Sequence, residues 1–130
     1  VAMELALADA GLGPAAIGHV NAHGTATDLG DVAESRATQR LFGSSQVFSG
    51  LKGHLGHTLG ACGALESWAS IQMMREGWFA PTLNLDNVDE QCGDLDYIIG
   101  AGRSLDVEHV MNNNFAFGGI NTSLIFKRAE

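Results

Sequence analysis

The amino-acid sequence predicts an α/β fold in which helices pack on a mixed sheet. Three observations lead to this class. Strand-like segments alternate with helical patterns along the first half of the chain, the last strand-like segments follow one another without helices, and a glycine stands after each helical pattern. Strands that alternate with helices build a parallel layer, and strands that follow directly can join it in the opposite direction.

Helical patterns cover residues 2–10, 28–42 and 61–76, and each is followed by the glycine that most readily closes a last turn. Strands are predicted at 17–23, 46–49, 95–99, 107–112 and 122–126. Because apolar residues cover most of the circumference of 61–76, we expect this helix to be buried. The connection 81–94 shows little periodicity and reads as irregular.

The composition fits one globular domain over residues 1–130, with 45% hydrophobic and 17% charged residues. A formal net charge of −8 disfavours a nucleic-acid surface, and no apolar run approaches the ~20 residues that span a membrane. Two cysteines make no disulfide framework, so we expect a cytoplasmic protein. Because Val1 lies inside a helical pattern, we expect a segment of a longer protein.

A histidine follows the first predicted strand. His23 precedes Gly24, and the hydroxyls of Thr25 and Thr27 come directly after. Strand ends are where α/β folds bind ligands, and a neutral imidazole there can donate a hydrogen bond to a carbonyl oxygen that gains negative charge. The threonines can bind the amides of an extended ligand. The alternative is a histidine whose ring is satisfied by the backbone at a strand end.

The second segment holds Lys52, His54 and His57 among glycines. A buried lysine needs a partner, and Glu66 on the following helix is the natural candidate; the alternative is a solvated lysine. The spacing of His54 and His57 leaves a metal site open as a weaker hypothesis, since no third ligand follows at a defined spacing.

The third segment, Phe115 to Gly119, follows a predicted strand. The backbone N–H groups of Phe117, Gly118 and Gly119 can donate to an oxyanion, and the two aromatic rings can line an apolar channel. The alternative is a hairpin with two core phenylalanines. Of the two cysteines, Cys62 stands among small residues and reads as a packed small hydrophobe, and Cys92 has no base near it in sequence.

These segments together resemble the β-ketoacyl-acyl-carrier-protein synthases, condensing enzymes of the thiolase-like fold. The resemblance rests on residues 20–27, 52–67 and 113–121, supported by 81–85 and 123–127, in the family's order. It implies the C-terminal half of the thiolase-like fold without its first strand. The motif sequences most resemble those of stand-alone bacterial fatty-acid elongation enzymes.

The resemblance implies roles for single residues. His23 and His57 match the active-site histidines that polarise the malonyl thioester and stabilise its enolate. Lys52 matches the motif lysine and Glu66 the acid of its network. Phe117 matches the aromatic residue that gates the acyl channel and lends its N–H to the oxyanion hole.

Further implications concern substrates and partners. Thr25 and Thr27 match the threonines that bind phosphopantetheine, which is carried on an acyl carrier protein, so no resident cofactor or metal is expected. The family's acyl-accepting cysteine belongs to its N-terminal half, and this chain has no match for it. We therefore expect a chain that is inactive alone, pairs with that half, takes malonyl and acyl thioesters, and is part of a homodimer when complete.

The sequence also departs from the family pattern. Asn114 replaces a usual serine, Ala116 a glycine and Ile120 a threonine, changes that can stiffen or reshape the gating loop because alanine resists positive φ. Two further functions stay open: a non-catalytic module that binds pantetheine or a partner half, and part of a polyketide-type ketosynthase.

Overall fold

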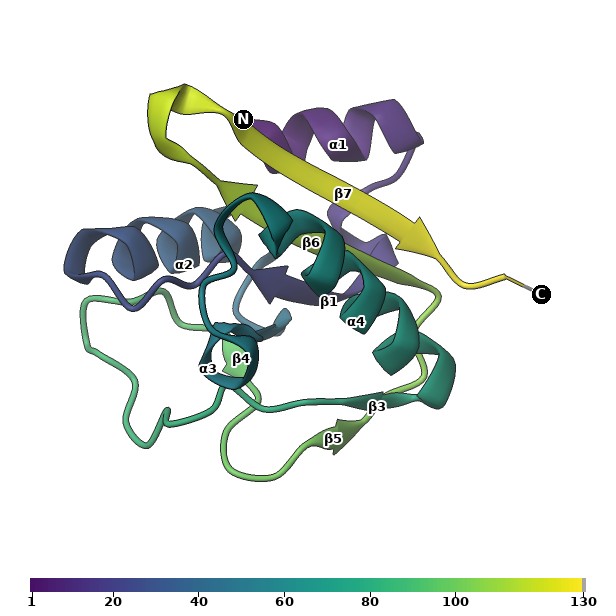
Figure 1. Ribbon diagram of the computed structural model, residues 1–130. Helices are drawn as coiled ribbons and strands as arrows, with labels where there is room; N and C mark the ends of the chain where they lie inside the picture. Colours follow the sequence, from purple (N-terminus) through teal and green to yellow (C-terminus); the bar gives the residue numbers. More distant parts are fainter. Residues whose placement is uncertain (130) are drawn as a thin grey trace.

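A computed structural model describes residues 1–129 and shows a mixed sheet with helices on both faces (Figure 1). The helices are α1 (Ala2–Ala10), α2 (Asp28–Phe42), α3 (Lys52–Leu55) and α4 (Cys62–Glu76), with 3-10 turns η1 (Pro14–Ala16), η2 (Leu59–Ala61) and η3 (Phe117–Gly119). The strands are β1 (Ile17–Ala22), β2 (Val47–Gly50), β3 (Trp78–Phe79), β4 (Asp96–Tyr97), β5 (Arg103–Ser104), β6 (His109–Phe115) and β7 (Asn121–Lys127).

The main sheet has the strand order β4-β2-β1-β6-β7. The first four strands run parallel, and β7 pairs antiparallel with β6 through the short turn that contains η3. The predicted α/β class with a mixed sheet is therefore confirmed. Sequence patterns missed the separate two-stranded ribbon of β3 and β5, whose strands of two residues are too short to show a period.

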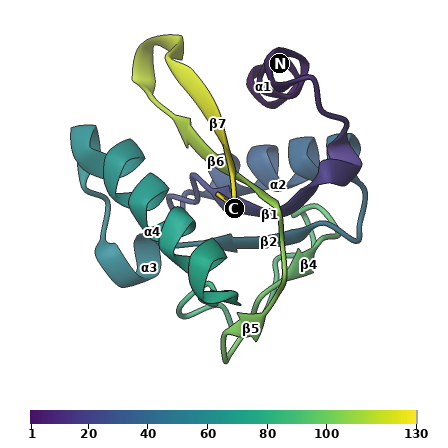
Figure 2. The same cartoon turned by 90° about the vertical axis from the view of Figure 1, so that its right-hand side faces the viewer.

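Two apolar clusters lie on opposite faces of the sheet. One joins Met3 and Leu7 of α1 with Val20 of β1 and packs against the apolar side of α2. The other joins Met73 and Met74 of α4 with residues of β6 and the β3 region. Figure 2 shows α4 on one side of the sheet and α1 on the other.

The helix α4 is not buried all round, contrary to the prediction for 61–76. Its inner face packs on β6, but the side chains of Leu65 and Trp68 are 43% and 64% exposed. A sequence pattern counts apolar residues without showing how many packing partners surround them. In the part of the chain that the structure describes, the sheet covers only one side of this helix.

Alternation along β6 turns consecutive asparagines to opposite faces of the sheet. Asn112 and Asn114 bond to groups of α4, whereas Asn113 donates to the sulfur of Met3 in α1. Successive side chains of a strand point to opposite faces, so this pattern follows from the extended backbone. These hydrogen bonds anchor both helical layers to β6.

Candidate functional site

The carboxyl ends of three neighbouring parallel strands bring the three sequence motifs to one edge of the sheet. β1 ends immediately before His23, β2 ends two residues before Lys52, and β6 ends at Phe115. Parallel strands point their carboxyl ends to the same edge, where α/β folds place ligand sites. Residues far apart in sequence therefore meet because of the strand order β2-β1-β6.

Two imidazole rings converge at this edge. The ring centroids of His23 and His57 lie 5.7 Å apart in an edge-to-face arrangement, and the ring of Phe115 lies 6.0 Å from that of His23. His23 is half-buried and His57 is exposed. The two histidines that the resemblance assigns to one active site thus lie close together, with Phe115 beside them.

The environment of His23 keeps its ring neutral. Burial, and after it the nearby charges of Lys52 and His57, lower the pKa of His23 from 6.5 to about 4. At neutral pH the ring therefore carries one proton, so one nitrogen can donate a hydrogen bond and the other can accept one. Its Nδ1 atom is buried and has no partner among the described residues.

Two carboxylates of α2 hold the backbone of the His23 loop. Glu34 accepts hydrogen bonds from the N–H of His23 at 2.8 Å and of Gly24 at 3.0 Å, and Asp31 accepts one from Thr25 at 3.1 Å. Burial raises the pKa of Glu34 to about 7 despite those two N–H donors. The sequence did not reveal these contacts, because acids near the start of a helix are also favoured by the helix dipole.

Lys52 is the link between two of the motifs. Its Nζ donates to the carbonyl oxygen of His23 and to Oε1 of Glu66 at 2.6 Å, and both side chains are buried. The second oxygen of Glu66 accepts a hydrogen bond from the side-chain amide of Asn114 at 2.8 Å. The predicted pairing of Lys52 with Glu66 is confirmed as a contact, and the connection from Glu66 to β6 through Asn114 was not foreseen.

The segment after His57 folds back on its ring. The Leu59 N–H donates to Nδ1 of His57 at 3.1 Å, and the sulfur of Cys62 lies 3.4 Å from the same nitrogen. Cys62 is buried, as its packing role predicts. Its contact with the imidazole was missed, although its distance of five residues from His57 at the start of a helix was a signal for it.

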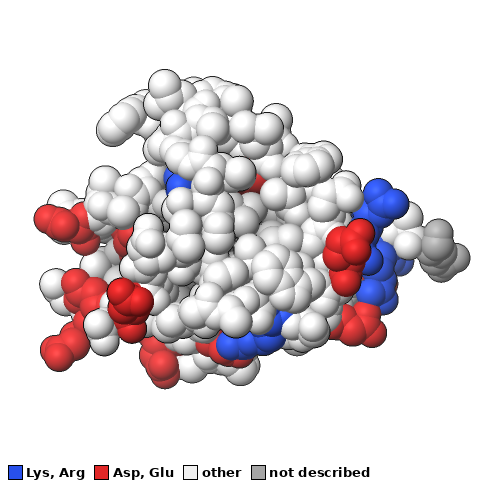
Figure 3. Space-filling view, turned by 60° about the horizontal axis from the view of Figure 1, so that its bottom comes forward, with Lys and Arg blue, Asp and Glu red and all other residues white. Residues whose placement is uncertain are grey.

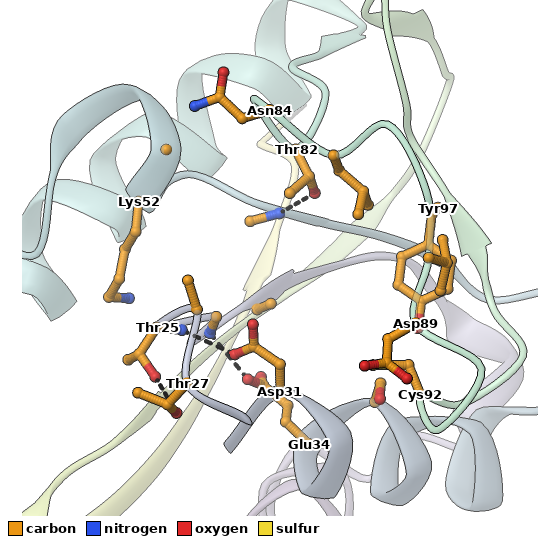
Figure 4. A pocket seen from close by; sticks show the side chains of 18 of the residues that line it. Thr25, Thr27, Asp31, Glu34, Lys52, Thr82, Asn84, Asp89, Cys92 and Tyr97 are labelled. Atoms are coloured by element: carbon orange, nitrogen blue, oxygen red, sulfur yellow. Dashed lines mark hydrogen bonds between the residues drawn. The ribbon is translucent and has the colours of Figure 1, made fainter. Parts of the chain in front are cut away.

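A cavity of about 570 Å³ opens beside this edge, and Thr25, Thr27 and His57 are among its lining residues. Figure 4 shows the two threonine hydroxyls next to each other, 3.0 Å apart, with the Lys52 side chain across from them. Cys92 and Tyr97 line another part of the cavity, together with residues of the 81–94 connection. The predicted irregular connection thus forms one wall.

The structure does not bring all predicted residues to this point. Phe117, Gly118 and Gly119 form η3 at the tip of the β6–β7 turn, and the Phe117 side chain is fully exposed. Among the described residues, the ring of Phe117 has no aromatic contact with either imidazole, unlike that of Phe115. The two glycines adopt positive φ angles of 80° and 78°, which explains why glycine occupies both positions.

His54 does not join His57 in a ligand set. Its Nε2 lies 2.8 Å from the carbonyl oxygen of Pro81, whereas His57 faces Leu59 and Cys62. Within residues 1–129 no group of three or more His, Cys, Asp or Glu side chains has the geometry of a metal site. The hydrogen-bond partners of these two rings thus give the metal hypothesis no support.

Figure 3 shows how the charged side chains are distributed over one face of the molecule. On the face drawn in Figure 3, Lys and Arg form small separate groups, and Asp and Glu side chains occupy much of the rim. A phosphate backbone requires a continuous basic surface, which the described residues of this face do not provide. Among the helices in the described range, none has both the length and the apolar character needed to cross a membrane.

Comparison with known proteins gives consistent matches. Residues 1–86 match the family model of the β-ketoacyl synthase C-terminal domain. The chain is 41% identical over 129 residues to 3-oxoacyl-[acyl-carrier-protein] synthase 2 of Coxiella burnetii, a match that covers 97% of this chain and 31% of that protein.

Solved structures of ketosynthases also match this chain. A β-ketoacyl synthase from Burkholderia phymatum matches with a TM-score of 0.97 and 63% identity, over 98% of this chain and 31% of that one. A ketosynthase in complex with its type II PKS acyl-carrier protein matches with a TM-score of 0.92 and 30% identity, over 98% and 32%. The chain spans about a third of the length of these relatives.

Proposed function

Because this chain belongs to the β-ketoacyl synthase family, we propose that it forms the C-terminal part of a 3-oxoacyl-[acyl-carrier-protein] synthase of fatty-acid biosynthesis. In this role it supplies the groups that stabilise the enolate of a malonyl thioester. The observation that carries the proposal is the convergence of His23 and His57, whose ring centroids lie 5.7 Å apart beside an open cavity.

The proposed reaction is a decarboxylative condensation. The bond between the malonyl C2 and its carboxylate breaks, carbon dioxide leaves, and the electron pair forms an enolate with the thioester oxygen. Imidazole N–H groups of His23 and His57 donate to that oxygen. The enolate carbon then attacks the carbonyl carbon of an acyl thioester, whose sulfur leaves as a thiolate. Because His23 is neutral at neutral pH, its ring has one N–H to donate to that oxygen.

Lys52 and Glu66 orient this machinery. The Lys52 ammonium fixes the carbonyl oxygen of His23, and Glu66 balances its charge in a buried environment. A buried cation with a partner keeps a defined place, which a solvated lysine would not. We assign both residues a positioning role in the reaction.

We propose that the carrier arm binds in the cavity. Thr25 and Thr27 present two adjacent hydroxyls on its wall, and hydroxyls at this spacing can bind the amide groups of a phosphopantetheine arm. The relatives are named for acyl-carrier-protein substrates, and one is solved with its acyl-carrier protein. An acyl carrier protein is therefore the proposed partner, with malonyl and acyl thioesters as substrates.

The acyl-accepting thiol comes from a separate segment in this proposal. Cys62 is buried with its sulfur against His57, and Cys92 lies in the cavity wall with no histidine near it in the described contacts. The imidazole nitrogen beside the Cys62 sulfur already accepts the Leu59 N–H, so neither thiol has the adjacent free base that a cysteine nucleophile requires. We expect no acyl-enzyme on either cysteine when this chain alone meets an acyl thioester.

An exposed apolar surface provides the place for that segment. Leu65 and Trp68 project from α4, and Leu124 of β7 is exposed on the same side of the sheet, since its partner in the ladder is Asn112. Exposed apolar patches mark interaction sites. Because the relatives are about three times as long as this chain, we propose that their N-terminal part has a counterpart that packs here.

A chimera tests the function. In the Burkholderia phymatum synthase, the C-terminal part that this chain matches is replaced by this chain, and condensation of an acyl thioester with malonyl-carrier protein is measured. We expect 3-oxoacyl product, and loss of product when His23 is changed to glutamine. A folded chimera that binds the carrier arm but forms no product would instead favour a non-catalytic binding module.

A polyketide-type ketosynthase is the second candidate. The match to a type II PKS ketosynthase at 30% identity favours it, and the 41% identity to a fatty-acid-type synthase favours the first. The same chimera separates the two when it is offered saturated acyl and poly-3-oxoacyl primers. Preference for the saturated primers supports the fatty-acid assignment, and preference for the others supports the polyketide one.

A further inference from the structure

One ring nitrogen of His57 is surrounded by the residues that follow it. Leu59 N–H donates to Nδ1 at 3.1 Å, and the sulfur of Cys62 lies 3.4 Å from Nδ1. The hydroxyl of Thr58 in turn donates to that sulfur at 3.5 Å. Two polar contacts therefore end at a single imidazole atom, and a third supports the sulfur that makes one of them.

These contacts determine where the ring proton lies. Because Nδ1 accepts a hydrogen bond from the Leu59 backbone, it carries no proton, and the neutral ring must hold its proton on Nε2. Between Nδ1 and the Cys62 sulfur, the thiol is then the only group with a hydrogen to donate. The Thr58 hydroxyl donates to the sulfur, which leaves the S–H free to point at the ring.

The backbone of this segment is strained in a way that serves the contact. Leu59 has a φ angle of 52°, a conformation uncommon for a bulky residue. Its side chain is 78% exposed, so burial of the leucine does not compensate for the strain. Strained residues of this kind cluster at functional sites, where the surrounding structure enforces them. Here the conformation aims an N–H at His57.

We propose that Cys62 is a positioning residue: its thiol is a second donor to Nδ1 of His57 and keeps the N–H of Nε2 available for the substrate oxygen. The inference rests on the function proposed for His57 and adds a role for the cysteine. No bond is made to sulfur, and the thiol remains protonated throughout. Cys62 is the first residue of α4, so the rigid helix fixes its place beside the ring.

The test is an NMR measurement on the 15N-labelled chain, in which the chemical shifts of the two ring nitrogens show which one carries the proton. We expect His57 to be mainly in the Nε2–H form. Removing one donor of ordinary net strength in Cys62→Ala raises the ratio of Nδ1–H to Nε2–H by about fivefold. Cys62→Ser retains a donor and keeps the ratio within about twofold of the unaltered chain.

Two further variants separate hydrogen bonding from packing. Cys62→Val fills the space of the thiol but has no hydrogen to donate, so we expect the same change in the ratio as in Cys62→Ala. If Cys62→Ala does not fold, the valine variant still tests the role of the thiol. Cys92→Ser is the matched control and leaves the ratio unchanged.

The possible results discriminate between the two proposals. An unchanged ratio in Cys62→Val overturns the role of Cys62 and leaves the proposed function intact. A proton found on Nδ1 in the unaltered chain contradicts both the role of Cys62 and the donor role of His57.

Discussion

The backbone N–H of His23 donates to a carboxylate oxygen of Glu34 at 2.8 Å, so an acid on α2 holds the loop that carries a proposed catalytic histidine. The second oxygen of the same carboxylate accepts the Gly24 N–H. Burial, with a smaller contribution from the nearby Asp31, raises the pKa of Glu34 to about 7. Loop geometry and the ionisation of this acid are therefore coupled.

This coupling predicts a pH dependence of stability. The unfolded chain releases the Glu34 proton near pH 4.5, whereas the folded chain retains it up to about pH 7. The contribution of Glu34 to the unfolding free energy therefore falls as the pH rises from about 4.5 to about 7. The fall amounts to about 3 kcal/mol. Glu34→Gln resembles the protonated acid and does not titrate. Urea unfolding at several pH values should show the variant gaining stability relative to the unaltered chain across this window; a constant difference would contradict the prediction.

His19 predicts a pH dependence of the opposite sign. Its ring is fully buried, its Nε2 lies 2.8 Å from the Ser49 hydroxyl, and burial lowers its pKa to about 3. In the unfolded chain the His19 ring binds a proton near pH 6.5, whereas in the folded chain it binds one only near pH 3. Stability is therefore lost as pH falls from about 6.5 towards 3, by up to about 5 kcal/mol.

His19→Gln tests this prediction because it removes the titrating ring and leaves Glu34 in place. We expect its unfolding free energy, measured in urea, to fall less between pH 6.5 and 4.5 than that of the unaltered chain. His23, whose pKa is also lowered, is common to both chains and cancels in the comparison. Parallel pH profiles would show that His19 is not responsible.

The buried pair of Lys52 and Glu66 predicts strong coupling in stability. Lys52→Met leaves the Glu66 carboxylate without its cation, which typically costs about 3–5 kcal/mol, whereas removing both charges costs less than the sum of the single changes. The coupling free energy of the pair is measured by urea unfolding of Lys52→Met, Glu66→Leu and the double variant.

The more exposed pair of Arg103 and Asp96 is the matched control, with an expected coupling of at most about 1 kcal/mol. If the changes at Lys52 and Glu66 are simply additive, the two side chains do not act as a pair.

The fold could be predicted from the sequence because its main elements have clear periods. Strands β1, β6 and β7 and helices α1, α2 and α4 all follow from apolar patterns and closing glycines. The pattern is weak where elements are short, so the β3–β5 ribbon and α3 were missed. The exposed face of α4 was also missed, because the periodicity of a helix does not show which of its faces have other elements to pack against.

The candidate site could be predicted in part. Motif order placed His23, His57, Lys52 and Glu66 together, and the parallel strands explain why. The contacts of Glu34 and Cys62 were missed, since side-chain bonds to a loop backbone or a ring leave no period in the sequence. The exposed ring of Phe117 shows that a motif match does not fix the conformation of a turn.

The central claim is that His23 and His57 jointly stabilise a malonyl enolate, and its most direct test is the rate of carbon dioxide release from malonyl-carrier protein by the Burkholderia phymatum chimera. We predict that His23→Gln and His57→Gln each lower this rate by about a hundredfold or more, while His54→Gln leaves it within about twofold. If either His23→Gln or His57→Gln releases carbon dioxide at the rate of the unaltered chimera, the two imidazoles do not share this task.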